Sequence, residues 1–299
     1  MNRRMLVCLS LVLVFAGASG QDYAFRVLVN KGKNEVRIGE NWQPIKVGAS
    51  ISSKDEIKVT ENAYVGLIHV SGKPLELKDA GKYKVTDLSA RIGPGSSVIN
   101  KYTDFILSSN SDKKNRLTAT GAVNRGGANT IKLFLPKSDA VVYNNNVIIG
   151  WEKDKSAAPF IVTFKSMFGE ELKQEESKGY DVTIDLNDAS FANEDNILVE
   201  VYAKADKNKI SETLTLKKLS RADKDRIKNS LSDFQKNVTE ETAINKLVLA
   251  GFYEQNNLII DAATAYQEAI KLAPDVVTFQ EDYDNFLLRH GLKELPPKK

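Results

Sequence analysis

Few side chains in this 299-residue chain stand at spacings that would do chemistry. The chain has two histidines, His69 and His290, and one cysteine, Cys8. A metal site needs several nitrogen, sulfur or carboxylate ligands close together, and His69 has no second histidine, cysteine or paired acid near it in the sequence. A Gly-x-Ser-x-Gly nucleophile elbow is missing as well. The sequence therefore indicates neither zinc chemistry nor serine hydrolysis.

Two further patterns come close to a motif and then depart from it. Gly121 and Gly126 have the spacing of a phosphate-binding loop, but Gly127 and Ala128 follow where that loop needs Lys and then Ser or Thr. A group of acids invites a calcium site, yet the calcium-hand pattern is absent, so we interpret them as solvated strand ends and loops. These acids are Asp181, Asp185, Asp188, Glu194 and Asp195. We predict no catalytic residue, no metal site and no cofactor, and keep an enzyme with dispersed acids as the last-ranked alternative.

Residues 1–20 have the order of parts found in a secretory signal. Basic residues at Arg3 and Arg4 come first, an apolar run follows, and small residues end the segment near Gly20. The apolar run is too short to span a bilayer, and we expect no transmembrane segment elsewhere. Cleavage near Gly20 would make Gln21 the first residue and remove Cys8, so the mature chain would form no disulfide. We predict a periplasmic protein.

The charge balance argues against a nucleic-acid partner. The chain has 42 basic and 39 acidic residues, and removing Arg3 and Arg4 leaves 40 against 39, a net charge of +1. Nucleic-acid binding would need a concentrated basic face.

Residues 22–92 predict an antiparallel β-domain, because short runs of alternating apolar residues are separated by Gly-, Asn- and Lys-rich turns. The expected strands include Ile45–Val47 and Tyr83–Val85. The order of features resembles the FecR-type domain, the periplasmic part of certain iron-uptake regulators. The matching residues are Trp42, Pro44, Ile45, Gly48, Asp55, Ile57, Leu67, Gly72, Leu75, Leu77 and Gly81. Those regulators carry an anti-sigma region and a membrane helix before this domain, whereas we expect only a cleavable leader at this place in the present chain. The resemblance therefore does not imply sigma-factor signalling.

Residues 93–130 and 131–217 predict a connector and a second β-domain. In the connector, a helix starting near Ser96 carries one apolar face, and a polar, Gly-containing linker follows. In the second segment, seven alternating runs predict an immunoglobulin-like or fibronectin-type sandwich with Trp151 buried between its sheets. We expect the run Asn144-Asn145-Asn146 to form a tight hairpin turn, because Asn tolerates positive φ.

Residues 221–290 predict a helical module, with a polar tail at 291–299. The stretch 243–274 resembles a tetratricopeptide repeat, in which small residues let two antiparallel helices approach closely. The residues that carry the resemblance are Leu249, Ala250, Tyr253, Ala262, Tyr266, Ala269 and Pro274, while Lys246 departs from the apolar type usual there. Flanking stripes at Ile227, Leu231 and Phe234 and at Val276, Phe279, Tyr283, Phe286 and Leu287 predict one helix on each side.

The repeat resemblance implies a partner-binding groove on the first helix of the pair. Carried onto this chain, the groove positions are Ile244, Leu247, Val248, Gly251 and Glu254. The alternative is that the helix over residues 221–236 covers them.

Together these features predict a multidomain protein, mainly β with an α-helical C-terminal part. The leading hypothesis is a non-enzymatic periplasmic adaptor that binds another protein of the cell envelope. The alternative is a glycan- or peptidoglycan-binding module that uses Trp42 and Tyr83, since β-sandwiches often bind sugars through exposed aromatic side chains.

Overall fold

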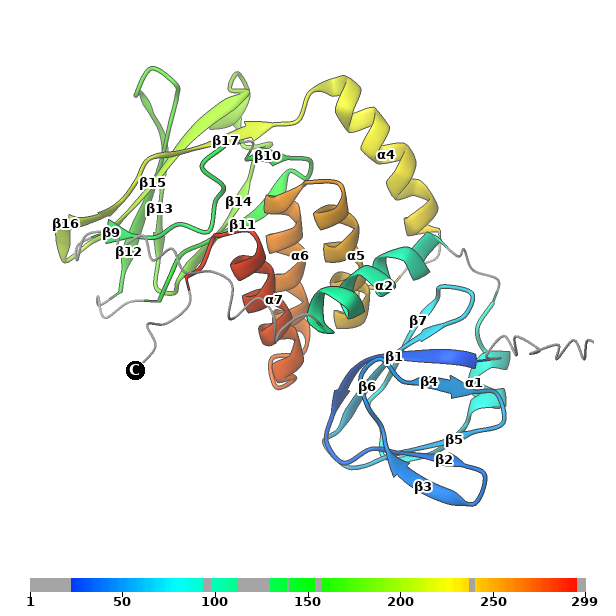
Figure 1. The fold of residues 1–299 in the computed structure, drawn as a ribbon. Helices are drawn as coiled ribbons and strands as arrows, with labels where there is room; N and C mark the ends of the chain where they lie inside the picture. The colour runs from blue at the N-terminus through cyan, green and yellow to red at the C-terminus, as the bar shows by residue number, and fades with distance from the viewer. Residues whose placement is uncertain are drawn as a thin grey trace, which may run out of the picture.

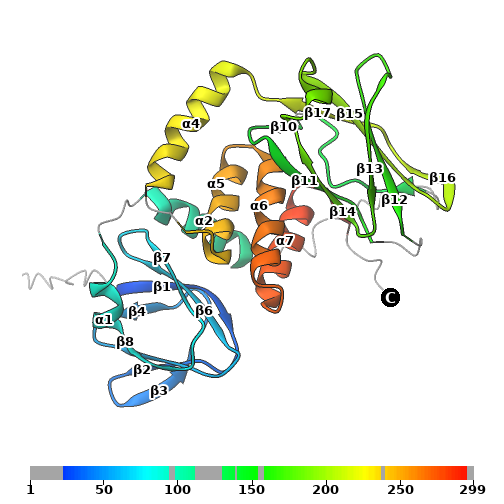
Figure 2. The ribbon, with the colours of Figure 1, turned by 180° about the vertical axis from the view of Figure 1, so that it is seen from behind.

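A computed structural model describes residues 23–93, 98–111, 130–138, 140–153, 158–236 and 240–294. The proposed leader at residues 1–20 and most of the proposed linker lie outside the described residues. Helices occupy the centre of the molecule and one β-domain lies at each end (Figure 1), an arrangement that the view from behind repeats (Figure 2). The chain is thus mainly β with C-terminal helices, as the sequence predicts.

The first β-domain consists of two four-stranded sheets that enclose a common core. One sheet has the order β4-β1-β6-β7 and the other β3-β2-β5-β8. The strands are β1 (Tyr23–Lys31), β2 (Glu35–Ile38), β3 (Asn41–Pro44), β4 (Ser50–Ser52), β5 (Glu56–Val59), β6 (Tyr64–His69), β7 (Pro74–Leu77) and β8 (Gly81–Lys84). Phe25, Val27, Ile57, Val65 and Leu67 lie in the core between the sheets.

Two expected strands of this domain are displaced in the structure. The strand predicted at Ile45–Val47 is instead β3, which ends at Pro44, and Val47 is exposed. The strand predicted at Tyr83–Val85 ends one residue earlier, because Val85 begins the short helix α1 (Val85–Ala90). Both differences place an apolar residue at the end of a strand, where a period-two pattern does not define the boundary.

Strand β6 is buried on both faces. Val65 and Leu67 point into the β-domain core, whereas Tyr64 and Ile68 belong to the core formed with the helices. Gly66 lies between them on the outer face, and a methyl group there would lie 2.7 Å from Cδ1 of Ile244. A strand covered on both sides should be apolar at successive positions, as this one is.

The second β-domain combines a seven-stranded and a two-stranded sheet. The larger sheet has the main path β10-β17-β15-β12-β13, with β16 paired to β15 and β9 paired to β16, and the smaller sheet pairs β11 with β14. The strands are β9 (Thr130–Ile131), β10 (Val141–Val142), β11 (Asn146–Gly150), β12 (Phe160–Lys165), β13 (Glu171–Ser177), β14 (Asp181–Asp185), β15 (Asn196–Ala203), β16 (Asp206–Ser211) and β17 (Leu214–Lys218). Trp151 is buried as predicted, and its ring packs edge-on against Phe160 with the centroids 5.5 Å apart.

The expected hairpin at Asn144-Asn145-Asn146 is wrong. Strand β10 pairs in parallel with β17, whereas β11 pairs with β14, so the three asparagines connect strands of different sheets. The backbone N–H groups of Tyr143 and Asn144 donate instead to Asp261 in the helical module.

The helices are α2 (Val98–Ser111), α4 (Arg221–Gln235), α5 (Ala243–Gln255), α6 (Ile259–Leu272) and α7 (Val277–Arg289). The side chains of Ser220 and Thr242 cap α4 and α5, which explains why these helices begin where they do. All the apolar residues predicted to form stripes on α4 and α7 are buried. The predicted polar tail also contributes to packing, because Leu292 is buried and Lys132 Nζ lies 2.9 Å from Glu294 Oε1.

Candidate functional site

The predicted partner groove on α5 is filled by the chain itself. The structure does bring the predicted positions together on α5, but all five are buried. At Gly251, an added methyl group would lie 3.0 Å from Ile106 Cδ1 and 3.3 Å from the carbonyl oxygen of Tyr102, so the backbone of α2 crosses α5 closely. At the other end of the groove, Ile244 contacts the outer face of β6. The expectation of an exposed groove at these residues is therefore wrong.

The residues that fill the groove differ from those that the alternative named. Helix α2 crosses α5 with Tyr102, whose ring packs edge-on against Phe252 at 5.3 Å. Helix α4 adds Phe234 at the end of this contact, with its centroid 5.9 Å from that of Phe252. Helix α2 and the first β-domain thus cover most of the groove face of α5, because their apolar residues share one core with it. Both lie far earlier in the chain than the helix over residues 221–236.

Glu254, the last predicted groove position, binds within the helical module. Its carboxylate accepts hydrogen bonds from Arg289 Nε at 3.0 Å, Arg289 Nη2 at 2.9 Å and the Tyr266 hydroxyl at 3.1 Å, and His290 Nε2 lies 2.9 Å away. Burial by itself would raise the pKa of this carboxyl, but the hydrogen bonds from His290 and Arg289 outweigh it and lower the pKa. This cluster joins α5 to the end of α7 and leaves no carboxylate oxygen facing a ligand.

Helix α6 closes the open edge of β11 with polar side chains. Thr264 Oγ1 accepts from the N–H of Ile148 at 3.0 Å, and Gln267 Nε2 lies 3.5 Å from the carbonyl oxygen of the same residue. One turn earlier, the carboxylate of Asp261 accepts from the backbone N–H groups of Tyr143 at 2.9 Å and Asn144 at 2.8 Å. The three side chains follow one another at intervals of three residues, so they lie along one face of the helix. They satisfy strand-edge groups that would otherwise be buried without partners.

Asp261 is the buried carboxyl in the contact between α6 and residues 143–148, which we call the seam. It has no solvent exposure. Burial raises its pKa to about 6, although the backbone hydrogen bonds from Tyr143 and Asn144 act in the opposite direction. The side chain therefore has a structural role that depends on pH.

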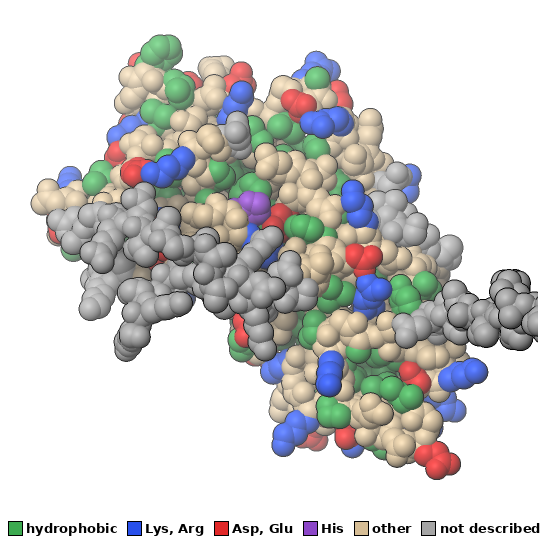
Figure 3. Space-filling model, in the orientation of Figure 1, with side chains coloured by type: hydrophobic (Ala, Val, Ile, Leu, Met, Phe, Trp, Pro, Cys, Tyr) green, Lys and Arg blue, Asp and Glu red, His purple; other side chains and the backbone are tan. Residues whose placement is uncertain are grey.

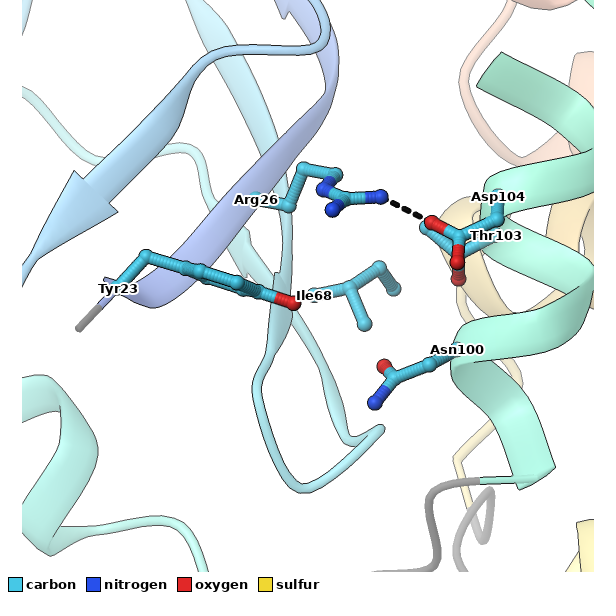
Figure 4. A pocket seen from close by; sticks show the side chains of 6 residues that line it. All are labelled: Tyr23, Arg26, Ile68, Asn100, Thr103 and Asp104. Atoms are coloured by element: carbon cyan, nitrogen blue, oxygen red, sulfur yellow. Dashed lines mark hydrogen bonds and ion pairs between the residues drawn. The ribbon is translucent and has the colours of Figure 1, made fainter. Parts of the chain in front are cut away.

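The first β-domain is attached to the helices by polar contacts around an apolar centre. Glu76 Oε1 of β7 accepts from the N–H of Ile244 at 2.9 Å and from the Tyr64 hydroxyl at 2.5 Å, so a strand residue caps the first turn of α5. On α2, the carboxylate of Asp104 pairs with Arg26, and the two side chains point toward one another (Figure 4). The cavity beside this pair measures about 10 Å³, which is room for a single water.

The two residues proposed for glycan binding lie on opposite faces of their sheet. Trp42 stands opposite Arg37 on the outer face, whereas Tyr83 stands opposite the buried Ile57 on the inner face. They cannot form one stacking platform. The Trp42 ring is half-buried with the cationic groups of Arg37, Lys58 and Lys82 within 5.7–5.8 Å of its centroid.

The acids considered for calcium do not converge. Among the described residues, no group of three or more His, Cys, Asp and Glu side chains is placed to hold a metal ion. Asp188 binds Lys173 at 2.6 Å and accepts from the N–H of Ser190 at 3.0 Å. His69 Nδ1 lies 2.8 Å from Ser71 Oγ, and its ring packs against Phe25.

An open concave site lies between α4 and the segment 143–145. This cleft has a volume of about 380 Å³. It is lined by Tyr143, Asn144, Asn145, Arg221, Lys224, Asp225 and Lys228. Three cations and one carboxylate give it a net charge of +2, and two asparagines add amide donors and acceptors. In Figure 3, both basic and acidic side chains are exposed on the surface over α4.

The sequence contains a signal for this cleft outside the recognised motifs. Arg221, Lys224 and Lys228 follow an i, i+3, i+7 spacing, so they form a stripe along α4 beside its apolar stripe. Nothing in the sequence places this stripe opposite Asn144 and Asn145, because that contact depends on how α4 leaves β17.

Comparison with known proteins adds no assignment. No protein-family model matches the chain, and no curated protein matches it. Within the described part of the chain, no helix combines the length and apolarity needed to cross a membrane.

Proposed function

We propose that this protein is a non-enzymatic, exported adaptor that holds binding surfaces in fixed positions for a protein partner in the cell envelope. The observation that carries the proposal is the placement of the helical module between two β-domains. Its apolar core is continuous with the outer face of β6, and Ile260 of α6 belongs to the core of the second β-domain. Such shared cores oppose independent domain motion, which suits a scaffold.

The packing of the α5–α6 pair supports a repeat-type module within this proposal. Ala250, Ala262 and Ala269 are fully buried between the helices, which is the role that small residues have in the tetratricopeptide family. Under the proposal, residues 22–92 are a FecR-type domain and residues 131–217 an immunoglobulin-like sandwich. Since α2 fills the usual groove, the partner would bind elsewhere on the helical module.

The test uses the chain from Gln21 to Lys299. A truncation after Leu219 would remove the helices that cover β6 and β11, so it would test folding rather than binding. The intact protein is immobilised and exposed to an envelope extract of its own cells, and any retained protein is purified and mixed with it in solution. The proposal expects a complex of defined stoichiometry on size-exclusion chromatography. Retention of no protein, or turnover of a substrate abolished by replacing one acid, would contradict it.

The glycan-binding alternative now depends on Trp42 alone. The ring is partly exposed among Arg37, Lys58 and Lys82, a setting that suits an acidic sugar. Sedimentation with purified cell wall tests this function. Co-sedimentation that is lost in Trp42→Ala and kept in Tyr83→Phe supports it, and absence of co-sedimentation rejects it.

Export is tested separately. Under the proposal, the mature protein begins near Gln21 and is released with the periplasmic fraction. Intact-mass measurement of the protein from fractionated cells checks both points, and a mass that includes residues 1–20 would contradict cleavage.

A further inference from the structure

We propose that the cleft between α4 and segment 143–145 binds an acidic, extended segment of a polypeptide. This inference rests on the proposed adaptor function and specifies the chemistry of its partner. The cleft combines open volume with several cations on one wall. Its volume of about 380 Å³ lies in the range of ordinary ligand sites.

The cations of the cleft are available to a ligand. Within the described ranges, Arg221, Lys224 and Lys228 form no ion pair with a carboxylate of the chain. On the same helix, Arg226 does not line the cleft and pairs with Asp223 at 3.1 Å. The unpaired stripe faces the cleft and the paired arginine does not. Electrostatic attraction to an anionic ligand is therefore not offset by the loss of internal ion pairs.

The spacing of the stripe favours a linear ligand. Lys228 lies seven positions after Arg221, which is about 10 Å along a helix. An extended peptide advances about 3.3 Å per residue, so about three residues span the stripe. A single small anion would contact one end of it only.

The remaining lining groups favour a peptide over a polyphosphate. Asp225 lies within the stripe and can accept a hydrogen bond from a peptide N–H, a donor that a polyphosphate lacks. On the opposite wall the exposed amide of Asn145 can donate and accept, as a peptide backbone requires. The ring of Tyr143 adds a partly exposed aromatic surface. Asn144 is held in place, because its Nδ2 donates to the Tyr253 hydroxyl at 2.9 Å.

The experiment measures binding of a fluorescein-labelled peptide of six alternating Asp and Glu residues by fluorescence anisotropy at low salt. Lys228→Glu should weaken binding about tenfold, and Asn145→Ala should weaken it about threefold. Arg226→Glu is the matched control, because it makes the same charge change on the same helix outside the cleft. It should change binding less than twofold after correction for the altered net charge. Unchanged melting temperatures verify that each variant is folded.

Three results would overturn the inference. They are absence of peptide binding, equal losses in Lys228→Glu and Arg226→Glu, and stronger competition by inorganic phosphate or by a six-nucleotide single-stranded DNA than by unlabelled peptide. If the peptide fails but the full chain still forms a stoichiometric complex with an envelope protein, the ligand class is wrong and the adaptor function stands. If no envelope protein is retained while the peptide binds as expected, the adaptor function fails and the site stands.

Discussion

Replacing Asp261 with asparagine should change how the stability of this protein depends on pH. The folded chain raises the pKa of Asp261 to about 6 from its ordinary 3.8, because the side chain is buried. The folded state therefore binds this proton more tightly than the unfolded state does. The resulting stabilisation is complete below 3.8 and is lost as pH rises through about 6.

The size of the effect follows from the two pKa values. The full difference corresponds to about 3 kcal/mol, and the part gained between pH 7.5 and pH 5 is about 1.4 kcal/mol. The asparagine side chain would not titrate, and its amide would leave one of the N–H groups of Tyr143 and Asn144 without an acceptor, at a cost of about 1–3 kcal/mol at every pH. Asp261→Asn should therefore lower the free energy of unfolding more at pH 5 than at pH 7.5, with the two differences about 1.4 kcal/mol apart.

Urea unfolding at pH 5, 6, 7 and 7.5 measures this difference. Trp151 in the second β-domain reports on the seam when Trp42, the only other tryptophan, is replaced by Phe. Measurements stop above pH 4.5, because the pKa of Glu254 is lowered from its ordinary 4.5 and its contribution, present above 4.5, is lost at lower pH.

Thr264→Val is the matched control for this series. It removes the acceptor for the N–H of Ile148 from the same seam without removing a titrating group. It should cost about 1–3 kcal/mol equally at pH 5 and pH 7.5. An effect of Asp261→Asn that is as independent of pH as that of Thr264→Val would refute the argument that burial governs the carboxyl.

Three further predictions concern the other junctions. Gly251→Val should lower the free energy of unfolding by about 1–3 kcal/mol, because α2 leaves no room for the added methyl groups. An unchanged melting temperature in calorimetry would show that α2 does not occupy the groove. Glu76→Ala should lower the free energy of unfolding by about 1–3 kcal/mol, because it leaves the N–H of Ile244 without an acceptor. Hydrogen exchange should then increase at the start of α5, and unaltered exchange there would contradict the cap. Arg289→Met should lower the free energy of unfolding by about 3–5 kcal/mol, because it removes the main partner of buried Glu254. A decrease below about 1 kcal/mol in urea unfolding would mean that the pair is not buried in solution.

Most strands and helices could be predicted because their signals are local. Alternating apolar residues identify the strands with one buried face, and the apolar stripes of α4 and α7 identify their buried sides. Strand β4 has only three residues, and no alternating run predicts it. Strands β13 and β16 are not predicted either. Their sequences, ELKQEES and DKNKIS, are mostly polar because these strands are largely exposed, so no apolar alternation marks them.

The candidate site was only partly predictable. The run of asparagines at 144–146 predicts a hairpin that does not form, and the local pattern of the basic residues of α4 predicts no site. The cleft exists because Asp261 holds the backbone at residues 143 and 144, while α4 leaves β17 in a direction that places its basic stripe opposite them. Neither the 117-residue separation between Asn144 and Asp261 nor the direction of a helix is visible in a local pattern.

The sequence alone determined most of the strands and helices, since side-chain periodicity and capping act over a few residues. It also contained the close packing of α5 on α6, which small residues at fixed spacing allow. Only the tertiary structure decided which surface remains open. The groove of α5 is filled because β6 is apolar on its outer face and α2 is apolar on one side, and burying both against α5 removes more apolar surface from water than leaving the groove exposed.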